Sequence, residues 1–382
     1  MTEARRTGGG TNKLALRRAW FQVHKWLGLV LAVLVIPLSL SGAALVWHEP
    51  LDRALNPARY AVSGRTLLPL GRYVAAARAV LKPGDRVAML TMPDGGGPVI
   101  VAGAPARAPR RPGPPMRTNV YLDPPTARVL EVAASNAGAI RFIHVLHGSL
   151  QVPGVGRSIV GWIGVAMALS SVTGLWLWWP VTGSVRRGFR WKRQRNVDGN
   201  LHHLLGFWIA LPLLVLSVTG MWISFPGVFG GGRPGGMGGG RGPGGPTRPM
   251  DRPARAVDRV VETGSALARG GTLRSVTWPL EGQPDWTLGF ARRGGPPASV
   301  KVADDSGSAS PAPARDQGGL ARLMRRIHDG EGMGIVWQVV IFAAGIIPAI
   351  LAVTGIIMWW RARRWRHDVA TRRASVRAVA AE

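Results

Sequence analysis

Four histidines are the residues of this chain best placed to do chemistry, because they recur at matching positions. The stretch around His24 returns around His202, and His147 matches His328 at nearly the same offset along the chain. Both alignments run without a gap, and each histidine stands ahead of a long uncharged stretch. The pattern predicts that the chain is two copies of one unit, with two histidines at helix entrances in each copy.

Glycines accompany these histidines at helical spacing. An α-helix turns about 100° per residue, so Gly28 and Gly42 share one face with His24. The same spacing follows His202, and a Thr-Gly pair lies at one and the same distance after each of the other two histidines. A flat macrocycle between helices needs such clearance. The glycines expected to pack against the histidine sites are Gly28, Gly42, Gly174, Gly206, Gly220 and Gly355.

Two histidines that face each other across a helix bundle can hold a haem iron from both sides. We therefore expect His24 and His202 to bind one haem b, and His147 and His328 to bind a second. The chain contains no cysteine, which excludes disulfides, iron–sulfur clusters and covalent haem attachment through cysteine. Four aligned polar residues facing a membrane interior are costly unless they are used.

Two other interpretations remain open at this stage. A histidine near a membrane surface can be a simple interfacial anchor, and glycine is common where membrane helices pack closely. A non-haem metal is the other competitor, since His144 and His147 have helical ligand spacing. His144 could also replace His147 as a haem ligand, although it aligns with Arg325 in the second copy. His203 is expected at lipid headgroups, and the Trp-Trp pairs at 178–179 and 359–360 in aromatic belts.

Four uncharged runs are each long enough to cross a bilayer, which takes about 20 apolar residues. The first run is too long for a cleaved signal peptide and is followed by no small-x-small site, so it is expected to stay as an anchor. The predicted spans are residues 26–47, 158–182, 201–225 and 333–360.

The formal net charge of +28 could suggest nucleic acid, but the positions of the basic residues argue for a membrane instead. The short segments 1–25, 183–200 and 361–382 are rich in Arg and Lys. Short basic flanks face the cytoplasm, which puts both termini there. The long loops 48–157 and 226–332 then lie on the outer side.

Each long loop is expected to hold a small α+β lobe. In the first, residues 68–81 have helical spacing, residues 86–92 and 98–102 are strand candidates, and 119–131 is a hairpin with a turn at 123–126. The second repeats the plan with a helix at 254–268, strands at 272–278, 286–291 and 299–302, and a turn at 304–307. The Gly/Pro/Arg-rich tract 229–248 shows no regular pattern. The predicted fold is a four-helix transmembrane bundle from an internal duplication, with two lobes.

These motifs resemble a known family. The His-x-x-Leu-Gly motif at His24 and His202, the Ser/Thr-Gly pairs, Leu-His-Gly at 146–148, Ile-His-Asp-Gly at 327–330 and the Trp-Trp ends look like PepSY-associated transmembrane proteins. The two lobes look like PepSY domains. Length and layout are most similar to the FoxB-type ferric-siderophore reductases of the bacterial inner membrane.

The resemblance implies two b-type haems, His24 with His202 on the cytoplasmic side and His147 with His328 on the periplasmic side. Electrons would pass from an unidentified cytoplasmic donor to a periplasmic Fe(III)-siderophore and release Fe(II). No catalytic residue beyond the haems is implied, and no nucleic acid. Outer-loop arginines could attract an anionic chelate or simply be solvated. They are Arg107, Arg110, Arg111, Arg233 and Arg241.

Two other functions stay open from the sequence. The chain could be a membrane binding or sensor protein whose PepSY-like lobes recognise a ligand without redox turnover. It could also be a permease for iron or a siderophore, although four spans leave little room for a pathway. The sequence shows no nucleophile with a partnered base, no paired carboxylates and no nucleotide-binding glycine loop that follows a strand and opens a helix.

Overall fold

The structure is a computed structural model that describes residues 8–93, 95–105, 116–179, 196–229, 248–292, 297–312 and 319–380. The chain divides into two compact units, each made of segments that are far apart in sequence. The helical unit comprises Met1–Trp47, Ile143–Gly231 and Leu320–Glu382, and the sheet unit comprises His48–Phe142 and Gly232–Gly319.

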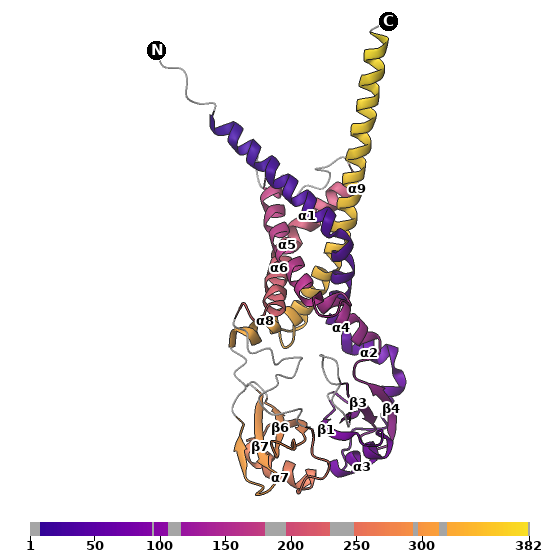
Figure 1. Ribbon diagram of the computed structural model, residues 1–382, viewed down its shortest axis with the longest axis vertical. Helices are drawn as coiled ribbons and strands as arrows, with labels where there is room; N and C mark the ends of the chain where they lie inside the picture. The colour runs from indigo at the N-terminus through magenta and orange to yellow at the C-terminus, as the bar shows by residue number, and fades with distance from the viewer. Residues whose placement is uncertain are drawn as a thin grey trace. The chain divides into compact units, whose positions relative to one another are not determined.

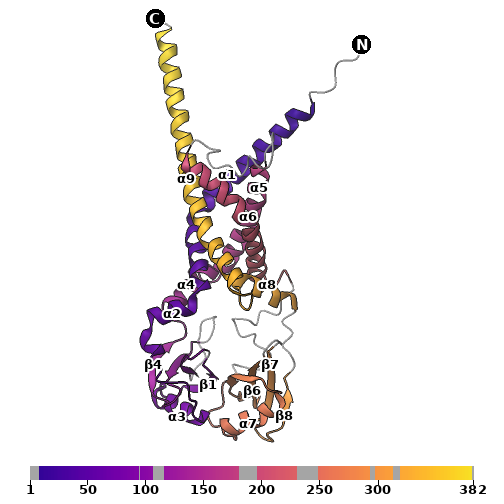
Figure 2. The same cartoon turned by 180° about the vertical axis from the view of Figure 1, so that it is seen from behind.

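Four long helices form the helical unit (Figures 1 and 2). They are α1 (Gly8–Val46), α5 (Gly156–Trp178), α6 (Val197–Ser224) and α9 (Ile335–Val379). Each is long and apolar enough to cross a membrane, with mean hydropathies of 2.5, 1.6, 2.1 and 2.6 in chain order. The prediction of four candidate spans is therefore confirmed. Two short helices, α4 (Ala139–Ser149) and α8 (Gly319–Asp329), precede α5 and α9.

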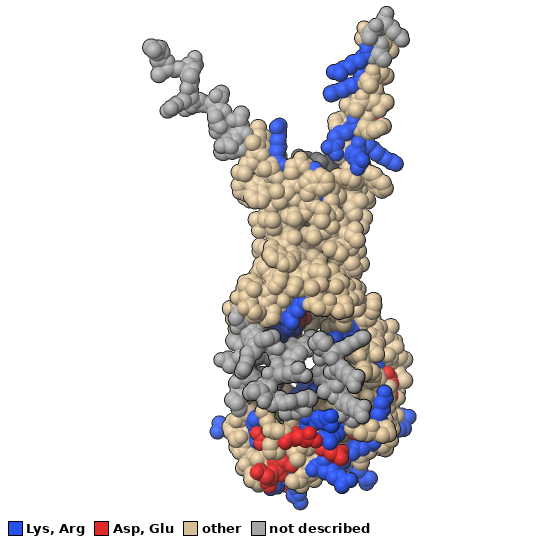
Figure 3. Space-filling view, in the orientation of Figure 1, with Lys and Arg blue, Asp and Glu red and all other residues tan. Residues whose placement is uncertain are grey.

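The surface of the bundle is apolar, as a lipid-facing surface must be. Large side chains such as Val30, Val33, Trp208 and Leu211 are more than half exposed. Figure 3 shows this belt as uniformly uncharged on the face in view, with blue basic side chains on the parts of α1 and α9 beyond it. Water would make such a surface costly, whereas lipid tails match it.

Two of the helices are longer than the predicted spans. α1 begins at Gly8 rather than near residue 26, and α9 continues to Val379 rather than stopping at residue 360. The α9 extension contains no glycine or proline and is rich in alanine and arginine, which are strong helix formers. Loss of apolar character ends a span, but it does not end a helix.

Small residues let the helices pack in close pairs. A Cβ built on Gly345 of α9 would lie 2.7 Å from the Ala43 Cβ of α1 and 2.8 Å from the Ser39 carbonyl oxygen. A Cβ on Gly164 of α5 would lie 3.2 Å from the Ser217 carbonyl oxygen of α6. Close approach of backbones through small residues is the usual basis of helix association in lipid. These two glycines were not singled out from the sequence.

The sheet unit contains one eight-stranded antiparallel sheet with the order β4-β3-β2-β1-β5-β6-β7-β8. Its strands are β1 (Arg86–Thr91), β2 (Val99–Ala104), β3 (Thr118–Leu122), β4 (Val129–Ala134), β5 (Thr272–Thr277), β6 (Asp285–Ala291), β7 (Ala298–Ala303) and β8 (Ala309–Pro311). The helices α3 (Leu70–Val80) and α7 (Val257–Leu267) pack against it.

Two small lobes were expected, one in each long loop, and in the structure the strands of both loops form one sheet. β1 pairs with β5, with Leu90 opposite Val276, and one core joins side chains from both sequence segments. This pairing satisfies two strand edges that separate lobes would leave open. In each segment a helix, α3 or α7, is followed by four strands, and the sheet order is the same read outward from β1 or from β5. An origin by duplication stays a prediction.

Most strand and helix positions in the sheet unit agree with the sequence pattern to within a few residues. Three short elements were missed: α2 (His48–Leu55), the 3-10 helix η1 (Pro57–Tyr60) and β8. Arg59 fixes the first two, because its guanidinium lies 2.9 Å from Asp52 of α2 and 2.8 Å from Glu131 of β4. The tract at 230–247 lies outside the described residues.

Two buried aspartates hold the turns of the sheet unit. Asp123 follows β3 and accepts hydrogen bonds from the Ser63 amide (2.7 Å), the Ser63 hydroxyl (2.6 Å) and the Thr126 hydroxyl (2.5 Å). Asp304 follows β7 and accepts from the Ala254 amide and the Trp286 indole. Burial alone would raise the pKa of Asp123, but these hydrogen bonds outweigh it and hold the pKa below its usual value.

We predict that Asp123→Asn destabilises the sheet unit at pH 7 by about 1–3 kcal/mol, because an ionised acceptor is lost from a buried site. The depressed pKa means that the ionised carboxylate stabilises the folded state at neutral pH. That contribution is lost as the pH falls through the folded-state pKa. Thermal unfolding should therefore differ between variant and parent at pH 7, and the difference should shrink at acid pH.

The matched control is Glu262→Gln on the exposed face of α7, where Glu262 forms an ion pair with Arg259 and both side chains are solvent-exposed. Its effect on stability should stay within about 0.5 kcal/mol. Equal effects of the two substitutions at pH 7 would contradict the role assigned to Asp123.

Candidate histidine centres

The structure brings the four histidines together in two pairs within the helical unit. His24 of α1 faces His202 of α6, with ring centroids 6.4 Å apart and the rings nearly perpendicular at 83°. His147 of α4 faces His328 of α8, with centroids 6.1 Å apart and an interplanar angle of 37°. These are the pairs that the sequence alignment suggested. All four rings are half-buried.

Each imidazole hydrogen-bonds through Nδ1 to a neighbouring helix. His24 Nδ1 lies 3.1 Å from Thr173 Oγ1 of α5, and His202 Nδ1 lies 3.0 Å from Thr354 Oγ1 of α9. In the second pair, His328 Nδ1 lies 3.0 Å from Thr219 Oγ1 of α6.

His147 follows a variant of this pattern. Its Nδ1 lies 2.9 Å from the carbonyl oxygen of Leu38 and 3.5 Å from Ser41 Oγ, both on α1. The Ser41 hydroxyl itself donates to the Leu38 carbonyl at 2.9 Å. A backbone carbonyl therefore takes the place that a threonine hydroxyl has at the other three rings.

These contacts assign the imidazole tautomers. Each threonine hydroxyl donates to a carbonyl one turn earlier in its own helix: Thr173 to Leu169, Thr219 to Val215 and Thr354 to Ile350, each at 2.9 Å. Its hydrogen is thus engaged, and its oxygen can only accept from the ring. Nδ1 must then carry the proton, and Nε2 keeps its lone pair. Such an outer hydrogen bond is how proteins orient a metal-binding histidine.

The Ser/Thr-Gly pairs are the seats of these rings, and we call them hydroxyl–glycine seats: Ser41-Gly42, Thr173-Gly174, Thr219-Gly220 and Thr354-Gly355. Their hydroxyl residues are at least nine-tenths buried. A Cβ on the glycine would approach the Cε1 atom of the facing imidazole to 2.7 Å at Gly42, 3.2 Å at Gly174, 3.0 Å at Gly220 and 3.5 Å at Gly355. The glycine therefore admits the edge of the ring.

The neighbour of four of the six predicted glycines is an imidazole edge. Clearance for a macrocycle at these positions stays a prediction. Gly28 and Gly206 differ from them. A Cβ on Gly28 would meet no atom within 4 Å, and one on Gly206 would meet only Leu351 Cδ2 at 4.0 Å. These two positions leave open space one turn from His24 and His202.

The sequence pattern predicted that the glycines lie near the histidines, but it assigned no role to the hydroxyl groups that precede them. Thr173 and Thr354, and Ser41 and Thr219, align in the two copies, yet a hydroxyl in an apolar helix commonly bonds to its own backbone. The useful signal was the combination, because a hydroxyl directly before glycine recurs four times opposite four histidines.

His147 and His328 lie outside the spans, and burial lowers the pKa of both imidazoles. Burial lowers the pKa of His147, assisted by the charge of His144 and opposed by the hydrogen bond to Leu38. Burial and the charge of His147 lower the pKa of His328 to about 4. A neutral imidazole is the form that binds a metal ion.

Other residues singled out from the sequence lie elsewhere. His144 is exposed on α4, one turn before His147. His203 stacks on the Trp178 indole, with centroids 5.7 Å apart, so it is not a simple headgroup contact. Trp178 is only 4% exposed and does not belong to a lipid-facing belt, whereas Trp179 and Trp360 are exposed. The outer-loop arginines 107, 110, 111, 233 and 241 lie outside the described residues.

Comparison with known proteins gives one match. The family model described as PepSY-associated TM region matches residues 21–362, which includes all four histidines and all four hydroxyl–glycine seats. No curated protein matches the chain. Among the described residues, no group of three or more His, Cys, Asp or Glu side chains is placed to hold a metal ion.

We predict opposite effects of alanine at two glycines of α1. Gly42→Ala should destabilise the protein by about 1–3 kcal/mol, because the new methyl group overlaps the ring of His147. Gly28→Ala meets no neighbour and should stabilise the ligand-free protein by up to about 1 kcal/mol through helix propensity. Thermal unfolding of the detergent-solubilised protein measures both, and a Gly42 variant as stable as the Gly28 variant would contradict the seat geometry.

Proposed function

We propose that this chain, which belongs to the PepSY-associated transmembrane family, carries electrons across the membrane with two haem b groups. The strongest support for this proposal is the arrangement of the four imidazole rings in two facing pairs. Each is made of two rings that face each other, and each ring has Nδ1 engaged. His24 and His202 would hold one haem, and His147 and His328 the other.

The residues fit this group. An imidazole nitrogen binds a first-row metal at about 2.0–2.1 Å, so two rings on opposite sides of one ion have centroids roughly 6 Å apart. The observed 6.4 and 6.1 Å agree with that spacing. Each pair offers two nitrogen ligands, which suits a metal whose other four positions are filled by a macrocycle.

The two pairs lie at different levels of the four-helix bundle. His147 contacts Leu38 and approaches Gly42, and both of these lie further along α1 than His24. From the rise per residue of an α-helix, the pairs lie roughly 21–27 Å apart along that helix. The hydrocarbon core is about 30 Å thick, so the pairs cover most of its depth.

When bound, a haem supplies a one-electron redox couple that needs no acid or base. The chain's own residues orient and shield it. The hydroxyl–glycine seats fix the direction of each Nε2, and the buried hydroxyls and the Leu38 carbonyl set the electron density of each imidazole. The apolar helices exclude water, which together with these hydrogen bonds determines the reduction potential.

The direction of transfer follows from the basic residues. Beyond His24 and His202, the bundle ends in basic extensions of α1 and α9, on the segments that the positive-inside rule assigns to the cytoplasm. Arg17 also caps α5 there, donating to the carbonyls of Leu177 (2.6 Å) and Trp179 (3.0 Å). Electrons would enter at this pair from a cytoplasmic donor and leave at His147 and His328.

The substrate that suits such an outlet is a periplasmic Fe(III)-siderophore, as the resemblance to FoxB-type reductases implies. One electron converts Fe(III) to Fe(II), the chelate weakens, and Fe(II) is released. In this proposal the protein is a multi-pass protein of the bacterial inner membrane with both termini cytoplasmic.

The test is electron transfer across a sealed membrane. Proteoliposomes with dithionite trapped inside and a ferric siderophore outside should form Fe(II), measured with an impermeant ferrous chelator such as ferrozine. Protein inserted with its basic ends inward should support this at rates far above protein-free vesicles. His147→Ala and His24→Ala should each reduce the rate at least tenfold, because each removes one ligand of one pair.

Arg325→Lys on α8, outside both pairs, is the control and should keep the parent rate. A membrane binding or sensor protein would leave the ferric chelate unreduced in every sample, and that outcome would refute the proposed function.

A further inference from the structure

The C-terminal part of α9 is a basic helix that extends beyond the two histidine pairs. α9 continues without a break from its apolar stretch into residues 361–379. Residues 361–380 contain seven arginines and one aspartate. Figure 3 shows this segment as a basic projection beyond the uncharged belt of the helical unit.

The arginines nearest the belt have partners. Arg361 forms an ion pair with Asp198 of α6 at 2.8 Å. The Arg363 guanidinium lies over the Trp359 ring, 5.6 Å from its centroid. Both residues lie within about 5 Å of Trp360 along the helix axis, which is the level of lipid headgroups. The positive-inside pattern accounts for this part of the tail.

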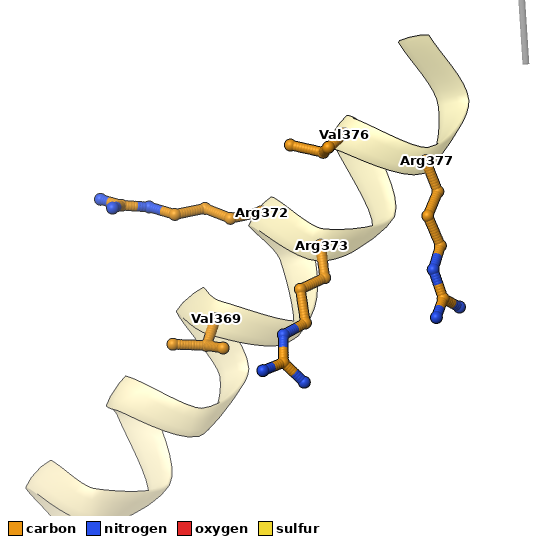
Figure 4. Close-up of a pocket in the computed structure, with 5 residues that line it drawn as sticks. All are labelled: Val369, Arg372, Arg373, Val376 and Arg377. Atoms are coloured by element: carbon orange, nitrogen blue, oxygen red, sulfur yellow. The ribbon is translucent and has the colours of Figure 1, made fainter. Parts of the chain in front are cut away.

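The last three turns of α9, residues 369–379, differ from the part near the belt, and we call them the distal segment. Arg372, Arg373 and Arg377 have no hydrogen-bond or ion-pair partner for their side chains among the residues that the structure describes. Val369 and Val376 lie about two helical turns apart and therefore on nearly the same side of the helix. Figure 4 shows both valines and Arg372 on one side of the ribbon, with Arg373 and Arg377 beside them. Val376 is 68% exposed.

Lipid headgroups do not account for the distal segment. Arg372 and Arg377 both lie well beyond Trp360 on the same helix. On a continuous helix along the membrane normal they are roughly 18 and 26 Å from Trp360. The headgroup layer is only about 5–7 Å thick on each side. The field of an anionic surface falls off over about 8 Å at physiological ionic strength.

A second copy of the same tail is also unsuited to bind the distal segment, because it would place arginine next to arginine and like charges repel. An acidic protein that covers the valine stripe matches both features of the surface. It supplies carboxylates for the three guanidinium groups and apolar contact for Val369 and Val376.

We propose that the distal segment is a docking site for a small acidic electron-carrier protein in the cytoplasm. This rests on the proposed function, which requires a one-electron donor on that side. Docking on the tail raises the effective concentration of the carrier at the membrane, and electrostatic attraction raises its rate of arrival.

The test measures binding of a flavodoxin, an acidic one-electron carrier, to the full-length protein in nanodiscs of neutral lipid. Affinity should be highest at low salt. The triple variant Arg372→Glu, Arg373→Glu, Arg377→Glu should bind at least tenfold more weakly and with less dependence on salt. The matched control with lysine in place of Arg372, Arg373 and Arg377 keeps the positive charge. Its affinity for flavodoxin should stay within about threefold of that of the parent.

Two outcomes would overturn the proposal. One is flavodoxin affinity that is absent in the parent or unchanged in the triple glutamate variant. The other is contact of the tail with lipid. Because the chain has no cysteine, Ser375→Cys gives a single site for a spin label, which should stay accessible to aqueous relaxants on anionic nanodiscs.

The variants His24→Ala and His202→Ala separate this proposal from the electron-transfer function. Both should bind flavodoxin as the parent does. Intact docking in a protein without redox activity would leave the docking site standing and remove only the proposed function.

Discussion

The hydrogen bond from each imidazole Nδ1 to a neighbouring helix is the interaction on which the rest of the helical unit depends. A polar ring in an apolar bundle must have its donor satisfied, because no water is there to replace a lost partner. At Gly42, Gly174 and Gly220 the missing side chain lets the ring edge approach the neighbouring helix more closely than a Cβ would allow. The four bonds link His24 to α5, His202 to α9, His147 to α1 and His328 to α6. They orient the four imidazole rings and link each of them to a second helix.

The requirement explains why this bundle contains so many small and hydroxylated residues. The hydroxyl–glycine seats receive the rings, and Gly164 and Gly345 bring the helix pairs α5–α6 and α1–α9 into close contact. Large apolar residues are left for the outer surface, where Val30 and Leu211 face outward. The sheet unit uses the opposite strategy. It gathers its apolar side chains in one core and holds its turns with the buried carboxylates of Asp123 and Asp304.

Length and hydropathy were sufficient to predict the four spans, and the gapless alignment suggested which histidines face each other. The sequence could not show that the two long loops share one sheet, because strand pairing such as Leu90 with Val276 joins residues far apart in the chain. It could not assign the hydroxyls either, since a threonine in a membrane helix bonds to its own backbone whether or not a ring is near. Helix ends were missed where charge, rather than glycine or proline, ended the apolar run.

Counting haem in the purified protein and its variants shows whether the two histidine pairs hold haem. We expect two haems b per chain by the pyridine haemochrome method, with low-spin spectra in both oxidation states. We expect one haem in His24→Ala and one in His147→Ala, because each substitution breaks a different pair. A parent protein that stays colourless after haem is supplied would contradict the account, and so would variants that both keep two haems.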